Sequence, residues 1–209
     1  MNQNLDLPFL RDEFIEEKAE EFLAKHHPRK SLPIPIELIV EGIGIDIIPF
    51  NNLKNWDVFG KNSALTPDLR YIYVDEWLCD PKANGNYFRF SLAHELGHIC
   101  LHADIYKSFP IKSPLDWKNT HIEIPEWFRS RLEYQANVFA GYVLVPRSCI
   151  KTKFSSVKDD LINEGIDPDD EVDLFEQYLS ERLSREFQVS NEVIKKRISK
   201  DSLSIIKKR

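Results

Sequence analysis

RFSLAHELGHICLH, residues 89–102, is the most informative stretch of this chain of 209 residues. On an α-helix, His98 lies one turn beyond His94 and about 40° around from it, so the two imidazoles can bind one ion. Glu95 lies about 100° from His94, beside the pair, where its carboxylate can reach a water on that ion. The pattern HExxH on a helix is typical of zinc metallopeptidases, in which the glutamate is the general base. The segment therefore predicts a helix over 87–103 with a metal-binding face.

A catalytic zinc ion usually has three protein ligands and keeps one position for water, so a third ligand is needed. His102 lies about 12 Å along a straight helix from His94, too far for one ion. Asp104 takes the place of the third ligand in HExxHxxGxxH sites, but Leu101 stands where those sites need a glycine. Neither residue is therefore our preferred ligand.

The third candidate is Glu133, on a helix predicted over 126–144. The residues on the same face of that helix have short side chains: Ser130, Ala136, Asn137, Ala140 and Gly141. They would let two helices pack closely, as a shared metal requires. Gly97, which costs its own helix roughly 1 kcal/mol, indicates a similar close approach. Asn137 could hydrogen-bond a ligating histidine and fix its ring. The alternative is an ordinary helix–helix seam with one surface glutamate.

The composition narrows the class of protein. The chain is 42% hydrophobic and 30% charged, and it is long enough to fold without a disulfide or a metal ion. With 28 Lys and Arg against 34 Asp and Glu, the net charge of −6 argues against bulk nucleic-acid binding. No apolar run approaches the roughly 18 residues of a membrane span. The first 14 residues lack an apolar signal core, and the three cysteines form no CxxC motif. We therefore expect a cytoplasmic protein with no membrane contact.

The remaining patterns predict one α+β fold, with a small antiparallel or mixed sheet packed on helices. The expected elements are an amphipathic helix over 9–26, a short helix from Pro35 to Gly42, strands over 45–50 and 70–76, a short strand near 57–65, a turn at 80–86, the helices over 87–103 and 126–144, and helices over 147–164, 170–187 and 190–206. The long stretch 104–125 has no clear periodicity, so it is either a substrate groove or lid, or a packed irregular insertion.

Four segments together resemble the ImmA/IrrE family of metallo-endopeptidases. Residues 89–102 match its HELGHxxxH pattern, and EYQANVFAGYVLVP (133–146) matches its downstream E-x-x-A-[ND]-x-F-A-x-x-x-L-x-P segment. LPIPIELIVEGIGIDI (32–47) resembles the family's N-terminal helix and strand, and FQVSNEVIKKRI (187–198) its C-terminal helix. The resemblance thus extends over 32–198. Glu133 follows His98 at a longer interval than the family uses, and the helix over 9–26 is extra.

The resemblance implies a zinc-dependent endopeptidase of the gluzincin type. One catalytic Zn²⁺ would be bound by His94, His98 and Glu133, with Glu95 as the base. Family members cleave a helix-turn-helix repressor and so relieve repression, which makes such a repressor the expected partner. The implied organisation is an N-terminal helical extension (1–31), a zinc metallopeptidase domain (32–146) and a C-terminal helical segment packed on it (147–209).

Two other interpretations of the metal motif stay open at this point. The protein could be a metal-binding anti-repressor or toxin–antitoxin partner that docks without proteolysis, or it could hold a structural zinc ion. For a peptidase, a second oxyanion donor is also needed, and Tyr71, Tyr73 and His121 are candidates. The alternatives are that the two tyrosines only pack within their strand and that His121 is a solvated loop residue.

The C-terminal segment also resembles the second half of a helix-turn-helix, with Ser190 placed as a helix N-cap. The last fifteen residues carry seven Lys and Arg against one Asp. Such a tail is more often solvated than bound to DNA, so we expect no direct DNA binding. Cys100 lies about 120° from His94 around the helix, which favours buried packing over ligation.

Overall fold

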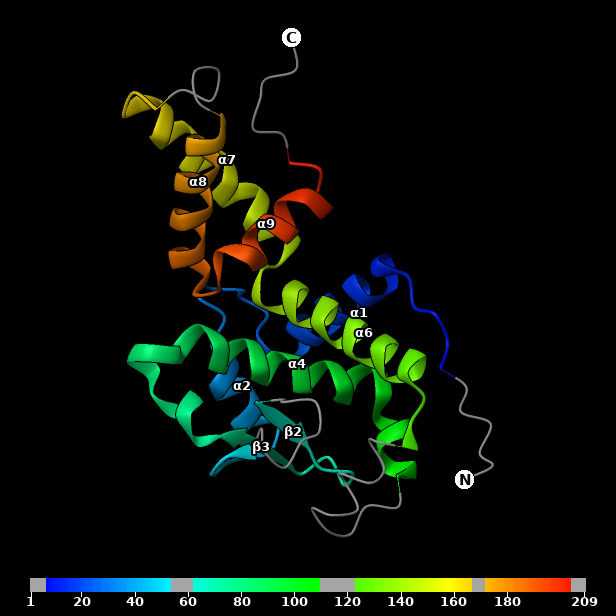
Figure 1. Ribbon diagram of the computed structural model, residues 1–209. Coiled ribbons are helices and arrows are strands. Elements are labelled where there is room, and N and C mark those ends of the chain that lie inside the picture. The colour runs from blue at the N-terminus through cyan, green and yellow to red at the C-terminus, as the bar shows by residue number, and fades with distance from the viewer. Residues whose placement is uncertain (1–6, 54–61, 110–122, 167–171, 204–209) are drawn as a thin grey trace.

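The computed structural model describes residues 7–53, 62–109, 123–166 and 172–203. Its elements form successive layers (Figure 1), with a small sheet, then helix α4, then helices α6 and α1, and a group of three C-terminal helices beyond them. A mixed sheet packed against helices confirms the α+β class. Within the described residues, every helix is too short or too polar to span a lipid bilayer.

The sheet has three strands in the order β1-β3-β2. Strand β1 (Asp46–Phe50) runs parallel to β3 (Tyr71–Asp75), while β2 (Ser63–Leu65) runs antiparallel to β3. All three residues of β2 are buried, because this strand contacts α4. The short strand expected near 57–65 is therefore present at the end of that range. Residues 54–61 lie outside the described part of the chain.

Helix α4 (Pro81–Ser108) is longer at both ends than the sequence pattern predicted. The expected turn at 80–86 is wrong, because these residues form the first turns of the helix. The Asp80 side chain accepts a hydrogen bond from the Lys82 amide at 3.0 Å, and Pro81 lies in the first turn, where its missing N–H costs nothing. The other end of the helix includes 104–108, and residues 110–122 of the same stretch lie outside the described part of the chain.

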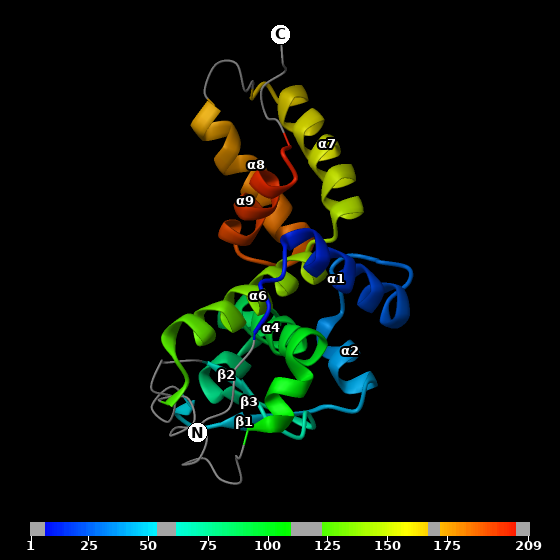
Figure 2. The same ribbon diagram turned by 90° about the vertical axis from the view of Figure 1, so that its right-hand side faces the viewer.

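Helix α6 (Glu126–Leu144) lies between α4 and α1 (Asp12–His26), as Figures 1 and 2 both show. Among the described elements, α4 and α6 make the most extensive contact. Helix α2 (Ile36–Gly42) and the 3-10 helix η1 (Glu76–Cys79) flank α4 on its other sides. Buried Arg89 ties α4 to its surroundings by donating to the Ile34 carbonyl at 2.6 Å and to Glu37 at 3.0 Å.

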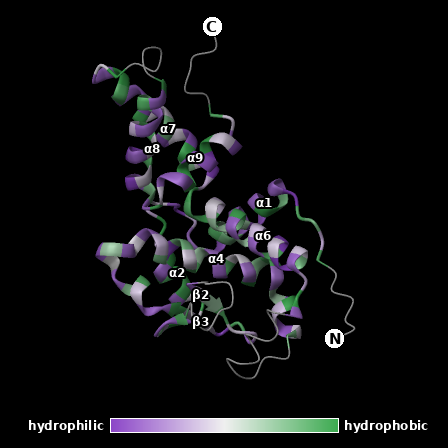
Figure 3. Ribbon diagram, viewed as in Figure 1, coloured by the Kyte–Doolittle hydropathy of each residue, from purple (hydrophilic) through white to green (hydrophobic). Residues whose placement is uncertain are grey.

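The three C-terminal helices are α7 (Arg147–Asn163), α8 (Val172–Phe187) and α9 (Asn191–Lys200). They project away from the sheet (Figure 2), and each carries both polar and apolar residues (Figure 3). The Ser190 side chain caps α9 by accepting from the Val193 amide, as predicted. Helix α9 ends earlier than the expected 206. The division into 1–31, 32–146 and 147–209 stays a prediction.

Two of the basic C-terminal residues, Arg197 and Lys200, contact other elements of the protein. Arg197 is buried, donates to the Val145 carbonyl at 3.2 Å and lies 4.1 Å from the Tyr142 ring centre. It also pairs with Asp201 at 2.8 Å, and Lys200 pairs with Asp12 of α1. These contacts join α9 to α6 and α1, whereas Lys195 and Lys196 are exposed.

Candidate metal centre

Helices α4 and α6 approach each other so closely that only a glycine fits at the crossing. A Cβ atom added at Gly97 would lie 2.9 Å from the Ala136 Cα atom and 3.0 Å from the Ala136 carbonyl oxygen. Both atoms belong to the backbone, so no side-chain rotation can relieve the clash. The close approach that Gly97 and the small residues of α6 indicated is confirmed, and it brings the histidine face of α4 against α6.

Replacing Gly97 by alanine should therefore destabilise the protein. Alanine gains about 1 kcal/mol of helix propensity, but overpacking against a backbone typically costs about 1–3 kcal/mol. We expect a net loss of up to about 2 kcal/mol in the free energy of unfolding, measured by urea denaturation. The change should also weaken metal binding, because it separates the helices that carry the ligands.

Gly85→Ala is the matched control, since Gly85 lies in the same helix and a Cβ there meets nothing within 4 Å. This substitution should stabilise the protein by about 0.5–1 kcal/mol. Opposite signs for the two substitutions are expected. A Gly97→Ala variant as stable as Gly85→Ala would contradict the close helix crossing.

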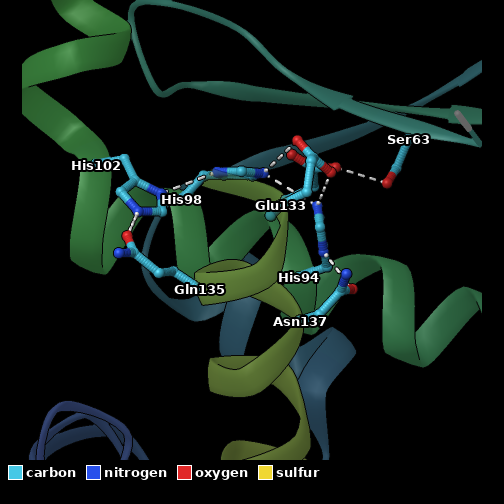
Figure 4. Close-up of polar contacts among 8 residues, drawn as sticks. Ser63, His94, His98, His102, Glu133, Gln135 and Asn137 are labelled. Atoms are coloured by element: carbon cyan, nitrogen blue, oxygen red, sulfur yellow. Dashed lines mark hydrogen bonds and ion pairs between the residues drawn. The ribbon is translucent and has the colours of Figure 1, made fainter. Parts of the chain in front are cut away.

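Three of the sequence-predicted residues converge on one point between the helices (Figure 4). The Nε2 atoms of His94 and His98 are 3.0 Å apart. The Glu133 carboxylate reaches across from α6, with 3.2 Å from Oε2 to His94 Nε2 and 3.6 Å from Oε1 to His98 Nε2. One ligand atom from each residue lies within 4.8 Å of the others, so the three form a candidate metal site.

This donor set fits a zinc ion. Two imidazole nitrogens and one glutamate oxygen are the protein ligands of a well-known group of catalytic zinc sites, which keep a further position for water or substrate. Both histidines are buried, whereas the Glu133 side chain is 26% exposed. Of the three converging side chains, Glu133 is therefore the most accessible to solvent.

Asn137 lies where the spacing on α6 placed it, one turn after Glu133. Its Oδ1 atom is 3.0 Å from His94 Nδ1, and an amide oxygen can only accept. With the His94 proton on Nδ1, this contact is a hydrogen bond to Asn137, and Nε2 is left to bind a metal ion. This is the ring orientation that a metal ligand needs.

His102 lies close to the site but does not reach the point where the three ligand atoms meet. Its backbone departs from helical geometry at φ −131° and ψ 16°, and its Nδ1 atom faces His98 Nδ1 at 3.1 Å. Its other nitrogen, Nε2, is 2.7 Å from Gln135 Oε1. Burial lowers the pKa of His102 to about 4, so the ring is neutral near pH 7. Asp104, the other rejected ligand, is exposed.

Glu95 lies beside the three converging residues, as its position on the helix predicted. It is 2% exposed, and its Oε1 atom accepts a hydrogen bond of 2.6 Å from Ser63 Oγ. Ser63 belongs to β2 and is itself buried, so the edge of the sheet fixes one oxygen of this carboxylate. Sequence reasoning missed Ser63, because nothing in its local pattern distinguishes it from any other strand serine.

The two tyrosines considered as oxyanion donors have ring contacts with neighbouring residues. Tyr73 packs edge-on against Phe50, with ring centres 5.7 Å apart, and Tyr71 lies near Arg70, which agrees with the alternative of strand packing. His121 lies outside the described residues. Cys100 is exposed, so the expectation that it packs in the core is wrong.

The fold and this arrangement are those of a metallopeptidase-like protein. The sequence model of the Peptidase M78 family, described as the IrrE N-terminal-like domain, matches residues 81–199. The match includes more than half of the chain, the three converging residues and Glu95, and the chain belongs to this family. This agrees with the resemblance found in the sequence motifs.

Comparison with solved structures shows a related fold. A Mycobacterium tuberculosis transcriptional regulator aligns with a TM-score of 0.51 and 21% sequence identity over 91% of this chain. The alignment includes 47% of that regulator, so this chain spans about half its length. No curated protein sequence matches this chain significantly.

Proposed function

We propose that the protein is a zinc-dependent endopeptidase that hydrolyses a peptide bond in a protein substrate. The observation that carries this proposal is the convergence of His94, His98 and Glu133, with the Glu95 carboxylate held separately beside them. Membership of a peptidase family supports it. A structural zinc site usually has four protein ligands and no open coordination position. It would not need a further buried carboxylate next to the histidines.

The chain's own residues have distinct tasks in this reaction. Zinc, held by His94, His98 and Glu133, would make water nucleophilic near neutral pH and polarise the scissile carbonyl. Glu95 takes the proton of the attacking water and delivers it to the leaving amine. Ser63 orients the Glu95 carboxylate, and Asn137 holds the His94 ring. The accessible side near Glu133 is where the substrate backbone enters.

We further propose that the substrate is a helix-turn-helix transcriptional repressor, whose cleavage relieves repression. The resemblance to the ImmA/IrrE family supports this choice. The structurally similar M. tuberculosis protein is named a transcriptional regulator, which is consistent with a role near transcription. The segment of α8 and α9 that resembles half of a helix-turn-helix is a candidate surface for such a partner.

The experiment that tests the proposal uses a repressor encoded next to the gene of this chain. The zinc-loaded protein should cut the repressor into new fragments, detected by gel electrophoresis and mass spectrometry. A chelator should abolish the cleavage, and added Zn²⁺ should restore it. If the repressor stays intact but elutes in a stable complex with the protein, the docking anti-repressor interpretation is correct and the peptidase proposal is wrong.

A further inference from the structure

The beginning of α1 and the chain that leads into it line an open groove on the protein surface. The groove has a volume of about 630 Å³, and its lining residues are Phe9, Leu10, Arg11, Glu13, Phe14 and Glu17. The chain that enters α1 is largely hydrophobic (Figure 3). Phe9 is 70% exposed and Phe14 is 42% exposed. Single exposed apolar residues are common, but two aromatic rings in one groove form a patch that can bind a partner.

The rest of the protein holds this segment in place. Leu7 is buried and packs into an apolar cluster with residues of α6. The Leu7 carbonyl accepts a hydrogen bond from Arg131 Nη1 at 2.6 Å, and the Pro8 carbonyl accepts one from Gln135 Nε2 at 2.9 Å. Phe9 therefore projects from a backbone that is already docked on α6. Because the backbone is fixed beforehand, little conformational freedom is lost when a partner covers this ring.

The acidic residues of α1 divide into two groups. Four of them form ion pairs with cations of this chain: Asp12 with Lys200, Glu16 with Arg147, Glu20 with Lys30, and Glu21 with Lys18. Glu13 and Glu17 form no ion pair with any residue that the structure describes, and both are exposed. Both line the groove, where Arg11 is the cation. The two carboxylates left without a partner are therefore those beside the apolar patch.

The spacing of these residues defines the shape of a complementary surface. Glu13 and Glu17 are one helical turn apart, so their carboxylates lie on the same side of α1. Phe14 lies about 60° around the helix from Glu17. A helix that carries an apolar side chain between two cations, themselves one turn apart, matches this arrangement in both hydrophobicity and charge.

We infer that the groove is a docking site for the basic, DNA-contacting helix of the repressor. The identity of this partner rests on the proposed function. A DNA-contacting helix exposes Lys and Arg to the phosphates, together with apolar side chains that contact thymine methyl groups. One of these apolar side chains packs between Phe9 and Phe14, and the cations on either side of it pair with Glu13 and Glu17.

This docking site acts on recognition of the substrate and leaves the chemistry to the metal centre. Helix α1 packs against α6, which carries Glu133, so a repressor held in the groove is close to the helix of a metal ligand. Helix α1 lies outside residues 81–199, which match the family model. The groove can therefore determine which repressor this chain recognises. A repressor docked by its DNA-contacting helix cannot bind DNA at the same time.

The test measures binding of the repressor encoded next to the gene of this chain. The zinc-loaded Glu95→Gln protein is used as the full chain, so that binding is measured without cleavage. Phe9→Ser removes the most exposed aromatic ring of the groove, and the double substitution Glu13→Lys with Glu17→Lys reverses its two unpaired charges. All three positions are exposed, and far-UV circular dichroism checks that each variant is folded.

Two residues of α2 provide matched controls outside the groove. Leu38→Ser removes an apolar side chain that is 67% exposed, and Glu41→Lys reverses an exposed charge. We expect both controls to bind the repressor as the unchanged groove does. Phe9→Ser should raise Kd by about 10-fold, the usual effect of removing an aromatic anchor from an interface. The double charge reversal should raise Kd by at least about 10-fold at low salt, and the effect should shrink as salt is added.

Two further measurements separate docking from chemistry. In protein that keeps Glu95, the groove variants should raise KM for the repressor by the same factors and leave kcat unchanged. A DNA duplex with the repressor's operator should compete with the protein for the repressor. Wild-type affinity in either groove variant would overturn the inference, and so would a complex in which the repressor binds operator DNA and this protein together.

The remaining outcomes are equally decisive. If the wild-type protein forms dimers that the groove substitutions dissociate, a second copy of the chain occupies the groove and the inference is wrong. If the repressor is cleaved and the groove variants cleave it with wild-type KM, the inference fails while the proposed function stands. If the repressor binds through the groove but is never cut, the docking site stands and the proposed peptidase function fails.

Discussion

Replacing Glu95 by glutamine should lower the rate of peptide cleavage by about 10²–10⁴-fold, the usual contribution of a positioned general base. Glutamine has nearly the same shape, and its amide oxygen can still accept the hydrogen bond from Ser63 Oγ. The amide cannot take a proton from water at neutral pH. The variant should therefore keep the fold and the zinc affinity, and lose turnover. Initial rates on the substrate and zinc titrations of the same preparation measure the two quantities.

Glu126→Gln is the matched control for this prediction. It removes the same charge from an exposed position in the first turn of α6, away from the converging ligands. Its cleavage rate should equal that of wild type. If Glu95→Gln retained wild-type activity with zinc bound, Glu95 would not be the base, and the proposed mechanism would have to be abandoned.

The features that the sequence predicts well are local ones. His94 and His98 share a face because they are one helical turn apart, and this holds wherever the helix lies in the fold. The same applies to Glu133 and Asn137 on α6, since short side chains on one face already indicate a close helix neighbour. The start of α4 was predicted wrongly, because Gly85 and the neighbouring asparagines suggested a turn more strongly than Asp80 and Pro81 suggested a helix start.

The features that could not be predicted join segments far apart in the chain. Ser63 reaches Glu95 only because β2 packs against α4, and three strand residues carry no signal of that contact. The hydrogen bond from Gln135 Nε2 to the Pro8 carbonyl depends on how the segment before α1 docks on α6. For His102, helical spacing argued against ligation, but it could not show that the ring would lie between His98 and Gln135.

Replacing Glu133 by alanine should weaken zinc binding by more than 100-fold. The loss should exceed the roughly 10–100-fold effect of removing a residue that only orients a ligand, because a ligand itself is removed. The site would be left with two neutral imidazoles, which lie on one helix and approach the ion from the same side. Among the three converging side chains, only Glu133 is a carboxylate and only Glu133 comes from α6.

Thermal and chemical unfolding measure this loss without any substrate. At a zinc concentration 100 times the wild-type Kd, binding should stabilise the wild-type protein by about 2.7 kcal/mol. A variant whose Kd has risen 100-fold should gain only about 0.4 kcal/mol at the same concentration. Glu126→Ala, on the same helix but exposed, should respond to zinc as wild type does. An unchanged zinc response in Glu133→Ala would mean that the third ligand is another residue, because two imidazoles from one helical turn cannot supply a three-ligand catalytic site.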